Sequence, residues 1–478
     1  MHDDPATPPT DSPPRGRWAA LWADVREAVR GSDRDFTRGS LPRAIFLLAV
    51  PMVLETSMHS VFAVCDTWFV ARLGPAAVAG VGLTDSLLAV VFAVSLGLSM
   101  GAAAMVARRI GEKDREGATV TTVQAIVLGL IVSVIVGVAG AANAGRLLEL
   151  MGAQQDVLDA GTGYATHIFG GCGTILMLFL INAAFRGAGD PFLAMRVLAL
   201  ANLANVVLDP ILIFGLGPIP AMGVTGAAVA TNLGRGLGVL YQVRILTSGR
   251  GRIRIRRRHL QVVPETMARL LRVSAYGIFQ FFVATSSFTG MVRVLTPYSS
   301  SALAGYTIAV RVIIFVLLPA WGLCNAAATL VGQNLGAGRP ERAVRSVWLT
   351  ARFNLGFLCS AGLLFIVAAR PIVSLFTDAE DVIGYGAQCL LLVSLGYPLM
   401  AFGMVLIASF NGAGDTRTPT FINLVCHWLL KIPLAWVLTW QLGWGPTGVF
   451  VAIPVAEAVA ALTAIVFFRR GHWQRKVL

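Results

Sequence analysis

Charged residues are scarce in this chain of 478 residues, where Asp, Glu, Lys and Arg together account for 13%. A soluble globular protein usually contains about 25%. Hydrophobic residues account for 56%, so there are too few polar groups to cover the surface of the protein in water. The composition excludes a soluble enzyme, a disordered scaffold and a secreted disulfide-rich domain. It predicts a protein embedded in lipid.

Lysine is the rarest charged residue, since Lys113, Lys431 and Lys476 are the only three among 38 basic residues. None of the three follows a glycine. A P-loop requires glycine before its lysine, so that backbone amides and the ammonium group both reach phosphate. The sequence therefore excludes this nucleotide site, and no polar stretch is long enough for a nucleotide-binding domain. Any transport would be driven by an ion gradient or be passive.

Cysteine and histidine are also few, with six residues of each type. The cysteines stand singly in apolar segments without any Cys-X-X-Cys pair, and the histidines are scattered along the chain. We therefore expect no disulfide, no cofactor and no metal site of the Cys/His type.

The net charge of +13 comes from basic residues placed between long apolar runs. This pattern indicates a membrane topology rather than nucleic-acid binding. With the N-terminus inside, the outer loops contain only Arg72, Arg146, Arg293 and Arg370. We therefore expect both termini in the cytoplasm and the chain in a bacterial inner membrane. The basic run 250–258 is either a topology anchor or a site for anionic lipid headgroups.

Twelve apolar segments reach the length of a membrane helix, which needs about 20 residues. They lie at 42–70, 77–107, 119–143, 160–185, 192–215, 223–246, 268–296, 302–332, 344–369, 385–410, 419–441 and 445–468. Residues 1–40 are polar and lack the apolar core of a signal peptide. We expect them to form a cytoplasmic tail that is partly helical near Trp18–Val29, and residues 469–478 to form a second tail.

The chain repeats itself at a spacing of 225 residues, which falls to 222 near the end of each half. Four blocks recur in the same order: 77–80 with 302–305, 106–111 with 331–336, 187–190 with 412–415, and 223–226 with 445–448. An even number of helices in each half predicts two six-helix bundles related by a parallel pseudo-two-fold axis. We call residues 41–246 the N-lobe and residues 268–468 the C-lobe. The basic segment 247–267 links them.

Acidic residues within the spans lie almost entirely in the N-lobe, which has Glu55, Asp66, Asp85 and Asp209, whereas the C-lobe has only Glu457. Ionisable groups inside a membrane are costly and indicate ion pathways by default. A cation site is therefore expected in the N-lobe. The alternative is that these groups only hold helices together.

Two helix faces gather polar residues at helical spacing: Glu55, His59 and Asp66 on the first helix, and Asn202, Asn205 and Asp209 on the fifth. Residues at these spacings share one face of a helix. Asp66 and Asp209 with amide neighbours can form a buried hydrogen-bonded network. Burial favours the neutral carboxyl group, so protonation can act as a switch. The same oxygens can ligate Na⁺.

Two further N-lobe residues have alternative interpretations. Pro51 removes a backbone hydrogen bond inside the first helix and can kink it. Such a kink is either a gate that responds to protonation of Asp66 or a static feature of packing. Asp85, near the outer end of the second helix, is either an exposed cap or a cavity residue.

In the C-lobe, the spacing of 222 relates Lys431 to Asp209 and Glu457 to Arg235. Arg235 and Glu457 either pair between the lobes or are satisfied separately. Lys431 and Arg311 either bias the C-lobe or line a central cavity.

Together these residues resemble the multidrug and toxic compound extrusion (MATE) family over about residues 42–468. The resemblance rests on Pro51, the segment 66–74 (DTWFVARLG), the Gly111 and Gly336 loops, the paired Gly-Ala-Gly-Asp turns, and the segment from Asn205 to Asp209 and Pro210. It implies a V of two six-helix bundles with alternating access. It also implies antiport, usually by a monomer, in which entry of H⁺ or Na⁺ drives export of small cationic or amphipathic compounds.

Within the family the chain is similar to the DinF-like branch. There a helix-1 Asp and a helix-5 Asn/Asp pair form the cation site, which the resemblance places at Asp66, Asn205 and Asp209, with Thr231 as a further polar member. The NorM-like branch adds acids on helices 7 and 10, but here helix 7 has Gln280 and helix 10 has no acid. This departure argues against a Na⁺ site in the C-lobe.

The sequence thus predicts a secondary transporter and not an enzyme. The main alternative, a lipid-linked saccharide flippase of the wider superfamily, would need a basic cavity, for which only Arg311 and Lys431 are candidates. A membrane-embedded prenyl transferase should have acid-rich metal motifs at a membrane face, and the loops lack them. A receptor or scaffold would not need acids on two helix faces.

Overall fold

The computed structural model describes residues 17–31, 34–249 and 251–476. The N-lobe consists of α2 (Leu41–Ala71), α3 (Pro75–Gly111), α4 (Arg115–Ala142), α5 (Ala144–Leu150), α6 (Gln155–Gly170), α7 (Cys172–Ala188), α8 (Pro191–Phe214) and α9 (Gly223–Ser248). The C-lobe consists of α10 (Pro264–Leu295), α11 (Ser300–Gly336), α12 (Pro340–Ser374), α13 (Glu380–Leu395), α14 (Tyr397–Gly412), α15 (Arg417–Asn423), η2 (Leu424–Leu430), α16 (Lys431–Trp436), η3 (Val437–Gln441) and α17 (Pro446–Arg470). Outside the lobes lie α1 (Arg17–Arg30), η1 (Arg257–His259) and η4 (His472–Arg475). The predicted all-α fold is confirmed.

Proline and glycine define many of the helix ends. Proline occupies the first position of α3, α8, α10, α12 and α17, where its missing N–H has no partner to lose. Gly189, Gly249 and Gly471 end α7, α9 and α17 in the left-handed conformation, which residues with a side chain adopt only with strain.

The spans follow the predicted apolar segments, with two corrections. Among the described residues, nine helices are long and apolar enough to cross a membrane, or eleven if each of two bent pairs counts as one span. The predicted single helices 160–185 and 385–410 are wrong in detail, because they are α6–α7, bent by 44°, and α13–α14, bent by 62°. The twelfth predicted span is α9, which is less apolar because it contains Asn232, Arg235 and Gln242.

Both bends occur at glycines that another helix approaches closely. A side chain at Gly171 would come within 2.2 Å of Asn232 in α9, and one at Gly396 within 2.6 Å of Pro454 in α17. The glycines therefore permit the close helix contact. The identity of the approaching helix is a long-range property, which local sequence patterns do not contain.

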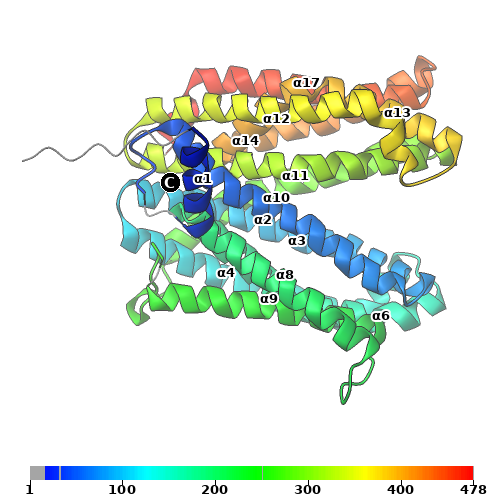
Figure 1. Cartoon of the computed structure of the whole chain (residues 1–478), viewed down its shortest axis with the longest axis horizontal. Coiled ribbons are helices and arrows are strands. Elements are labelled where there is room, and N and C mark those ends of the chain that lie inside the picture. Colours follow the sequence, from blue (N-terminus) through cyan, green and yellow to red (C-terminus); the bar gives the residue numbers. More distant parts are fainter. Residues whose placement is uncertain (1–16, 32–33, 250, 477–478) are drawn as a thin grey trace, which may run out of the picture.

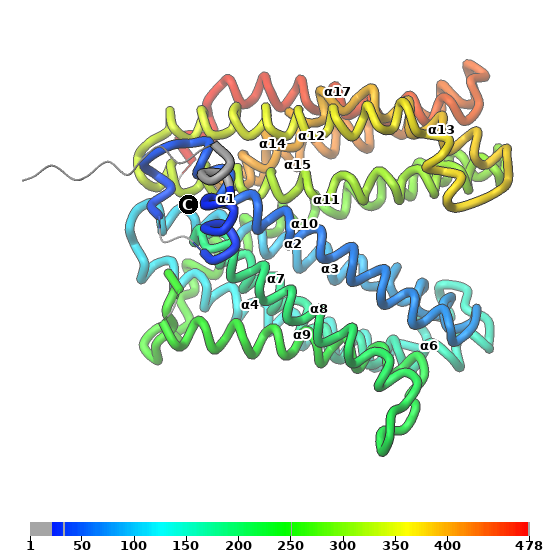
Figure 2. The backbone as a smooth tube through the Cα atoms, viewed as in Figure 1, coloured from blue at the N-terminus to red at the C-terminus, as the bar shows by residue number. Residues whose placement is uncertain are grey.

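The two lobes meet at one end of the molecule and diverge toward the other, as Figures 1 and 2 show. We call the end where they meet the basic end, because Arg109 lies there in the last turn of α3 and its loops contain Arg252 and Arg339. Here α2 and α3 of the N-lobe pack against α10 and α11 of the C-lobe. A side chain at Gly97 of α3 would lie 2.4 Å from the backbone nitrogen of Ile278 in α10, so these helices touch through their backbones.

A reciprocal contact at the basic end shows the repeat in three dimensions. A side chain at Gly111 would lie 2.1 Å from the carbonyl oxygen of Gln333, and one at Gly336 would lie 2.1 Å from that of Arg108. Gly111 and Gly336 are one repeat apart, and so are Arg108 and Gln333. The predicted two-fold relation between the lobes therefore holds at their interface.

The segment before α2 crosses the basic end and contacts both the linker and the C-lobe (Figure 1). Three arginines donate hydrogen bonds to its carbonyl groups: Arg339 to Thr37 at 2.8 Å, Arg342 to Gly39 at 2.9 Å, and Arg252 to Arg34 at 2.7 Å. Within the described residues, the predicted N-terminal tail thus contains α1 and a segment held against the loops of the basic end.

Candidate cation site in the N-lobe

Asn205 and Asp209, one turn apart on α8, meet Thr231 of α9 in the interior of the N-lobe. Asn205 Nδ2 donates to Asp209 Oδ1 at 3.1 Å and to Thr231 Oγ1 at 3.2 Å. All three side chains are buried, and Asp209 is 0% exposed. A side chain at Gly234 of α9 would come within 2.8 Å of the carbonyl oxygen of Ala201 in α8. The glycine therefore lets the two helices approach closely enough for this contact.

Asp66 of α2 faces the same interior, and its charge acts on Asp209, which places the two carboxyl groups within electrostatic reach of each other. Among the described residues, three oxygen atoms here are buried without a hydrogen-bond partner: Asp66 Oδ1, Asn205 Oδ1 and Asp209 Oδ2. A buried polar atom without a partner is costly. A proton on a carboxyl group, or a small cation between the oxygens, would remove this cost. The structure thus brings together Asn205, Asp209 and Thr231, and the charge of Asp66 acts on this cluster.

Arg235 of α9 is a charged neighbour to which the sequence assigned no role in this site. Its guanidinium group lies over the ring of Phe62, 5.4 Å from the centroid, and its charge acts on both Asp66 and Asp85. It therefore offsets part of the negative charge of the N-lobe interior. In the sequence, the only sign of this role was the presence of an arginine within an apolar, glycine-rich helix.

Two residues predicted for the site make other contacts. Asn202 Nδ2 donates to the carbonyl oxygen of Met58 at 2.9 Å, so it links α8 to α2 without joining the Asn205 cluster. His59 stacks on Phe179, with ring centroids 5.5 Å apart. Helical spacing indicates which residues share a face, but not which neighbouring helix each of them meets.

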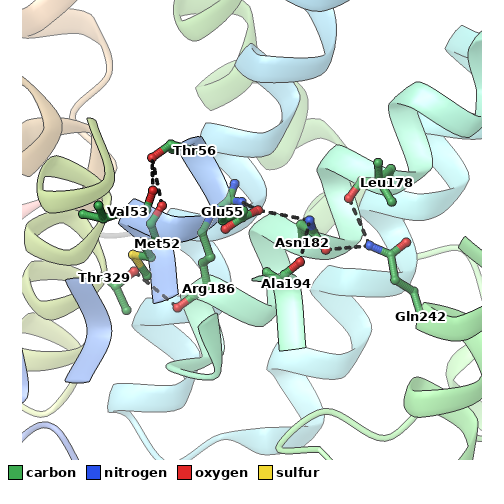
Figure 3. Close-up of polar contacts among 10 residues, drawn as sticks. All are labelled: Met52, Val53, Glu55, Thr56, Leu178, Asn182, Arg186, Ala194, Gln242 and Thr329. Atoms are coloured by element: carbon green, nitrogen blue, oxygen red, sulfur yellow. Dashed lines mark hydrogen bonds and ion pairs between the residues drawn. The ribbon is translucent and has the colours of Figure 1, made fainter. Parts of the chain in front are cut away.

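Glu55 belongs to a separate polar cluster of the N-lobe, which Figure 3 shows. Glu55 Oε1 accepts hydrogen bonds from Arg186 Nη1 at 2.7 Å and from Asn182 Nδ2 at 3.0 Å. Asn182 Oδ1 accepts in turn from Gln242 Nε2 at 2.7 Å. The carbonyl oxygen of Arg186 accepts from Thr329 Oγ1 of the C-lobe at 3.3 Å. This buried ion pair therefore connects the N-lobe interior to the interface between the lobes.

Pro51 lies inside α2, which remains helical from Leu41 to Ala71. The C-lobe helix α11 crosses beside it, since a side chain at Gly322 would lie 2.6 Å from the backbone nitrogen of Val53. The backbone hydrogen bond that proline removes is thus missing where the two lobes touch. The gating role of Pro51 stays a prediction.

The remaining candidates lie outside the hydrogen-bonded α8–α9 cluster, although the charge of Asp85 acts on Asp66. Asp85 of α3 and Arg311 of α11 are exposed, whereas Gln280 of α10 is buried with its Oε1 atom unpartnered. Lys431 Nζ lies 3.2 Å from His427 Nδ1. Within the part of the chain that the structure describes, no three His, Cys, Asp or Glu side chains are grouped as ligands for a metal ion.

Comparison with known proteins gives matches along both lobes. The model of the MatE family matches residues 51–211 and 277–437. The chain is 25% identical over 441 residues to "Probable multidrug resistance protein NorM" of Thermotoga maritima, covering 91% of this chain and 94% of that protein. It is 22% identical over 443 residues to "Multidrug export protein MepA" of Staphylococcus aureus, covering 90% and 94%.

Solved structures agree with these matches. A crystal structure of a MATE protein in the straight conformation has a TM-score of 0.85 and 26% identity, covering 91% of this chain and 97% of that chain. The outward-facing conformation of a multidrug resistance MATE family transporter has a TM-score of 0.85 and 25% identity, covering 91% and 96%.

Proposed function

This chain belongs to the multidrug and toxic compound extrusion (MATE) family of membrane transporters, and from this premise we propose that it exports small cationic or amphipathic compounds in exchange for protons. It is a transporter and not an enzyme, and alternating access between two lobes fits its fold. The observation that carries the proposal is in the N-lobe interior, where Asp66 and Asp209 each have a buried oxygen with no hydrogen-bond partner in the part of the chain that the structure describes. A proton taken up there would be released when the substrate enters or when the lobes change orientation.

Protons are favoured over Na⁺ by the hydrogen-bonding pattern of the site. Asn205 directs its amide donor, and not its amide oxygen, toward Asp209 and Thr231, an arrangement that suits a carboxyl group better than a bound metal ion. A metal ion needs several oxygens with free lone pairs, whereas a proton needs a single carboxyl group. In the exchange cycle, Asn205 orients the carboxyl group of Asp209, and Pro51 transmits the change to α2.

The charge distribution supports an orientation with the basic end in the cytoplasm of a bacterial cell. Arginines at this end outnumber those at the opposite end, as the positive-inside rule requires. Both termini would then be cytoplasmic, and the lobes would diverge toward the outside of the inner membrane. Each monomer carries both lobes and a complete candidate site, so a single chain would suffice for transport.

Purified protein in liposomes tests the proposed coupling. Vesicles with an acidic lumen should accumulate ethidium through the protein, and a proton ionophore should abolish the accumulation. A Na⁺ gradient at equal pH should not drive it. Accumulation driven by Na⁺ alone would replace the proton with Na⁺ as the coupling ion. Absence of accumulation under both gradients would contradict export of cationic compounds.

A further inference from the structure

The C-lobe carries a second intramembrane cluster at the position that the repeat relates to the N-lobe cation site. The spacing of 222 places His427 at the position of Asn205, Lys431 at that of Asp209, and Glu457 at that of Arg235. A cation thus replaces the carboxylate, and a carboxylate replaces the cation. The scaffold is repeated while the charges are inverted.

The side chain of His427 contacts both of the other C-lobe side chains. Lys431 Nζ lies 3.2 Å from His427 Nδ1, and His427 Nδ1 lies 3.6 Å from Glu457 Oε1. The side chains of His427 and Glu457 are 13% and 21% exposed, so the cluster is neither sealed in the protein nor open on its surface. We call these three residues the C-lobe triad.

The backbone around the triad departs from a regular α-helix. His427 lies within η2, which is π-helical, whereas its N-lobe counterpart α8 is an α-helix throughout. The carbonyl oxygen of His427 accepts a hydrogen bond from Ser287 Oγ of α10 at 3.1 Å. Pro433 lacks an N–H group and so removes one backbone bond from the same span. Such wide turns are rare and are found frequently at functional sites.

Within residues 17–31, 34–249 and 251–476, the triad retains unused hydrogen-bond donors. An ammonium group has three donors, and the contact with His427 takes one from Lys431. Because His427 Nδ1 accepts this bond, a neutral imidazole carries its own proton on Nε2. The helices packed against the triad bring no other charge, since α10 has none between Arg272 and Arg293, and Glu457 is the only charged residue of α17 before its last turn.

Two aromatic side chains lie on η2, which carries His427, and on α10, which packs against it. The rings of Phe282 and Trp428 have centroids 6.5 Å apart, and these side chains are 52% and 38% exposed. Trp428 Nε1 donates to Ser286 Oγ at 3.1 Å, which fixes the indole next to His427. An amphipathic molecule could place its apolar body on these rings and an acidic group at the triad.

We propose that Lys431 and His427 form a subsite for the carboxylate group of zwitterionic, amphipathic substrates. The N-lobe carboxyl groups would attract the cationic part of such a molecule, and the C-lobe triad would bind its anionic part. This inference rests on the proposed export function. It names the C-lobe residues that would hold the acidic group.

A matched pair of dyes tests the subsite. A rhodamine ethyl ester is cationic, whereas the corresponding free acid carries an additional carboxylate and is zwitterionic at pH 7. Fluorescence polarisation with the purified full-length protein in detergent measures the binding of each dye without any ion gradient. Lys431→Gln should weaken binding of the acid by about tenfold, as expected for loss of a hydrogen bond to a charged group. Binding of the ester should change by less than about twofold.

Two further variants separate recognition of the carboxylate from general effects. Arg352→Gln removes an exposed C-lobe cation of α12, outside the triad, and should leave the preference between the dyes unchanged. Lys431→Arg retains the charge and should recover part of the affinity for the acid. Equal weakening of both dyes by Lys431→Gln, no weakening of the acid, or wild-type protein that does not bind the acid would overturn the subsite. Binding is measured without a gradient. The protein could therefore fail to couple transport to protons and still show the predicted loss of affinity for the acid.

Discussion

Replacing Asp209 with asparagine is expected to reduce dye efflux at least about tenfold, to the level of cells without the protein. Asparagine resembles aspartate in shape. Its Oδ1 atom can still accept the hydrogen bond that Asn205 Nδ2 donates to Asp209 Oδ1 at 3.1 Å in the wild type. It cannot bind and release a proton, so the step that couples the gradient to transport is lost. The measurement is efflux of ethidium from pump-deficient bacteria, with and without a protonophore.

The matched control for this variant is Asp156→Asn, which makes the same chemical change at an exposed position of α6. It should leave efflux unchanged, and both variants should be present in the membrane at the wild-type level. Protonophore treatment should reduce wild-type efflux to the level of Asp209→Asn. Efflux by the Asp209 variant that equals the wild type and still responds to the protonophore would remove Asp209 from the coupling site.

Replacing Arg186 with methionine is expected to destabilise the folded protein by about 3–5 kcal/mol, the usual cost of breaking a buried ion pair by removing one partner. Glu55 is only 3% exposed and receives a 2.7 Å hydrogen bond from Arg186. Without the guanidinium group, its carboxylate would keep the bond from Asn182 but lose the neighbouring positive charge. Denaturant unfolding in detergent, followed by tryptophan fluorescence, measures the change.

The double variant Glu55→Gln with Arg186→Met provides the control for this prediction. Its glutamine can still accept the hydrogen bond from Asn182 Nδ2, now 3.0 Å from Glu55 Oε1, and no buried charge remains. We expect the double variant to be more stable than Arg186→Met alone, since replacing a whole buried pair is often neutral. A double variant less stable than either single variant would show that the ion pair does not determine the stability of this cluster.

Local patterns in the sequence were sufficient to predict most of the fold. The apolar segments lie within the observed helices because a run of about 20 apolar residues in lipid has to satisfy its backbone internally. The repeat predicted the relation between the lobes, which appears as the reciprocal contacts of Gly111 and Gly336. Helical spacing also placed Asn205 and Asp209 on one face, where they form a hydrogen bond.

Contacts between distant segments could not be predicted from one sequence. Glu55 was expected to share a face with Asp66, but it pairs with Arg186, 131 residues away. Asn182 and Gln242 received no prediction, since a single amide in an apolar helix carries no local signal of its partner. The bends at Gly171 and Gly396 likewise depend on the helices that approach those glycines.

Exchange of protons for substrate at the N-lobe carboxyl groups is the central claim, and proton release on substrate binding tests it most directly. Purified protein in a weakly buffered detergent solution is titrated with ethidium while a pH indicator follows the solution. The account predicts that the wild type releases protons in proportion to the dye bound. It also predicts that a variant with both Asp66→Asn and Asp209→Asn binds dye without acidifying the solution. Equal proton release by the variant, or dye binding by the wild type without any release, would contradict exchange at these two residues.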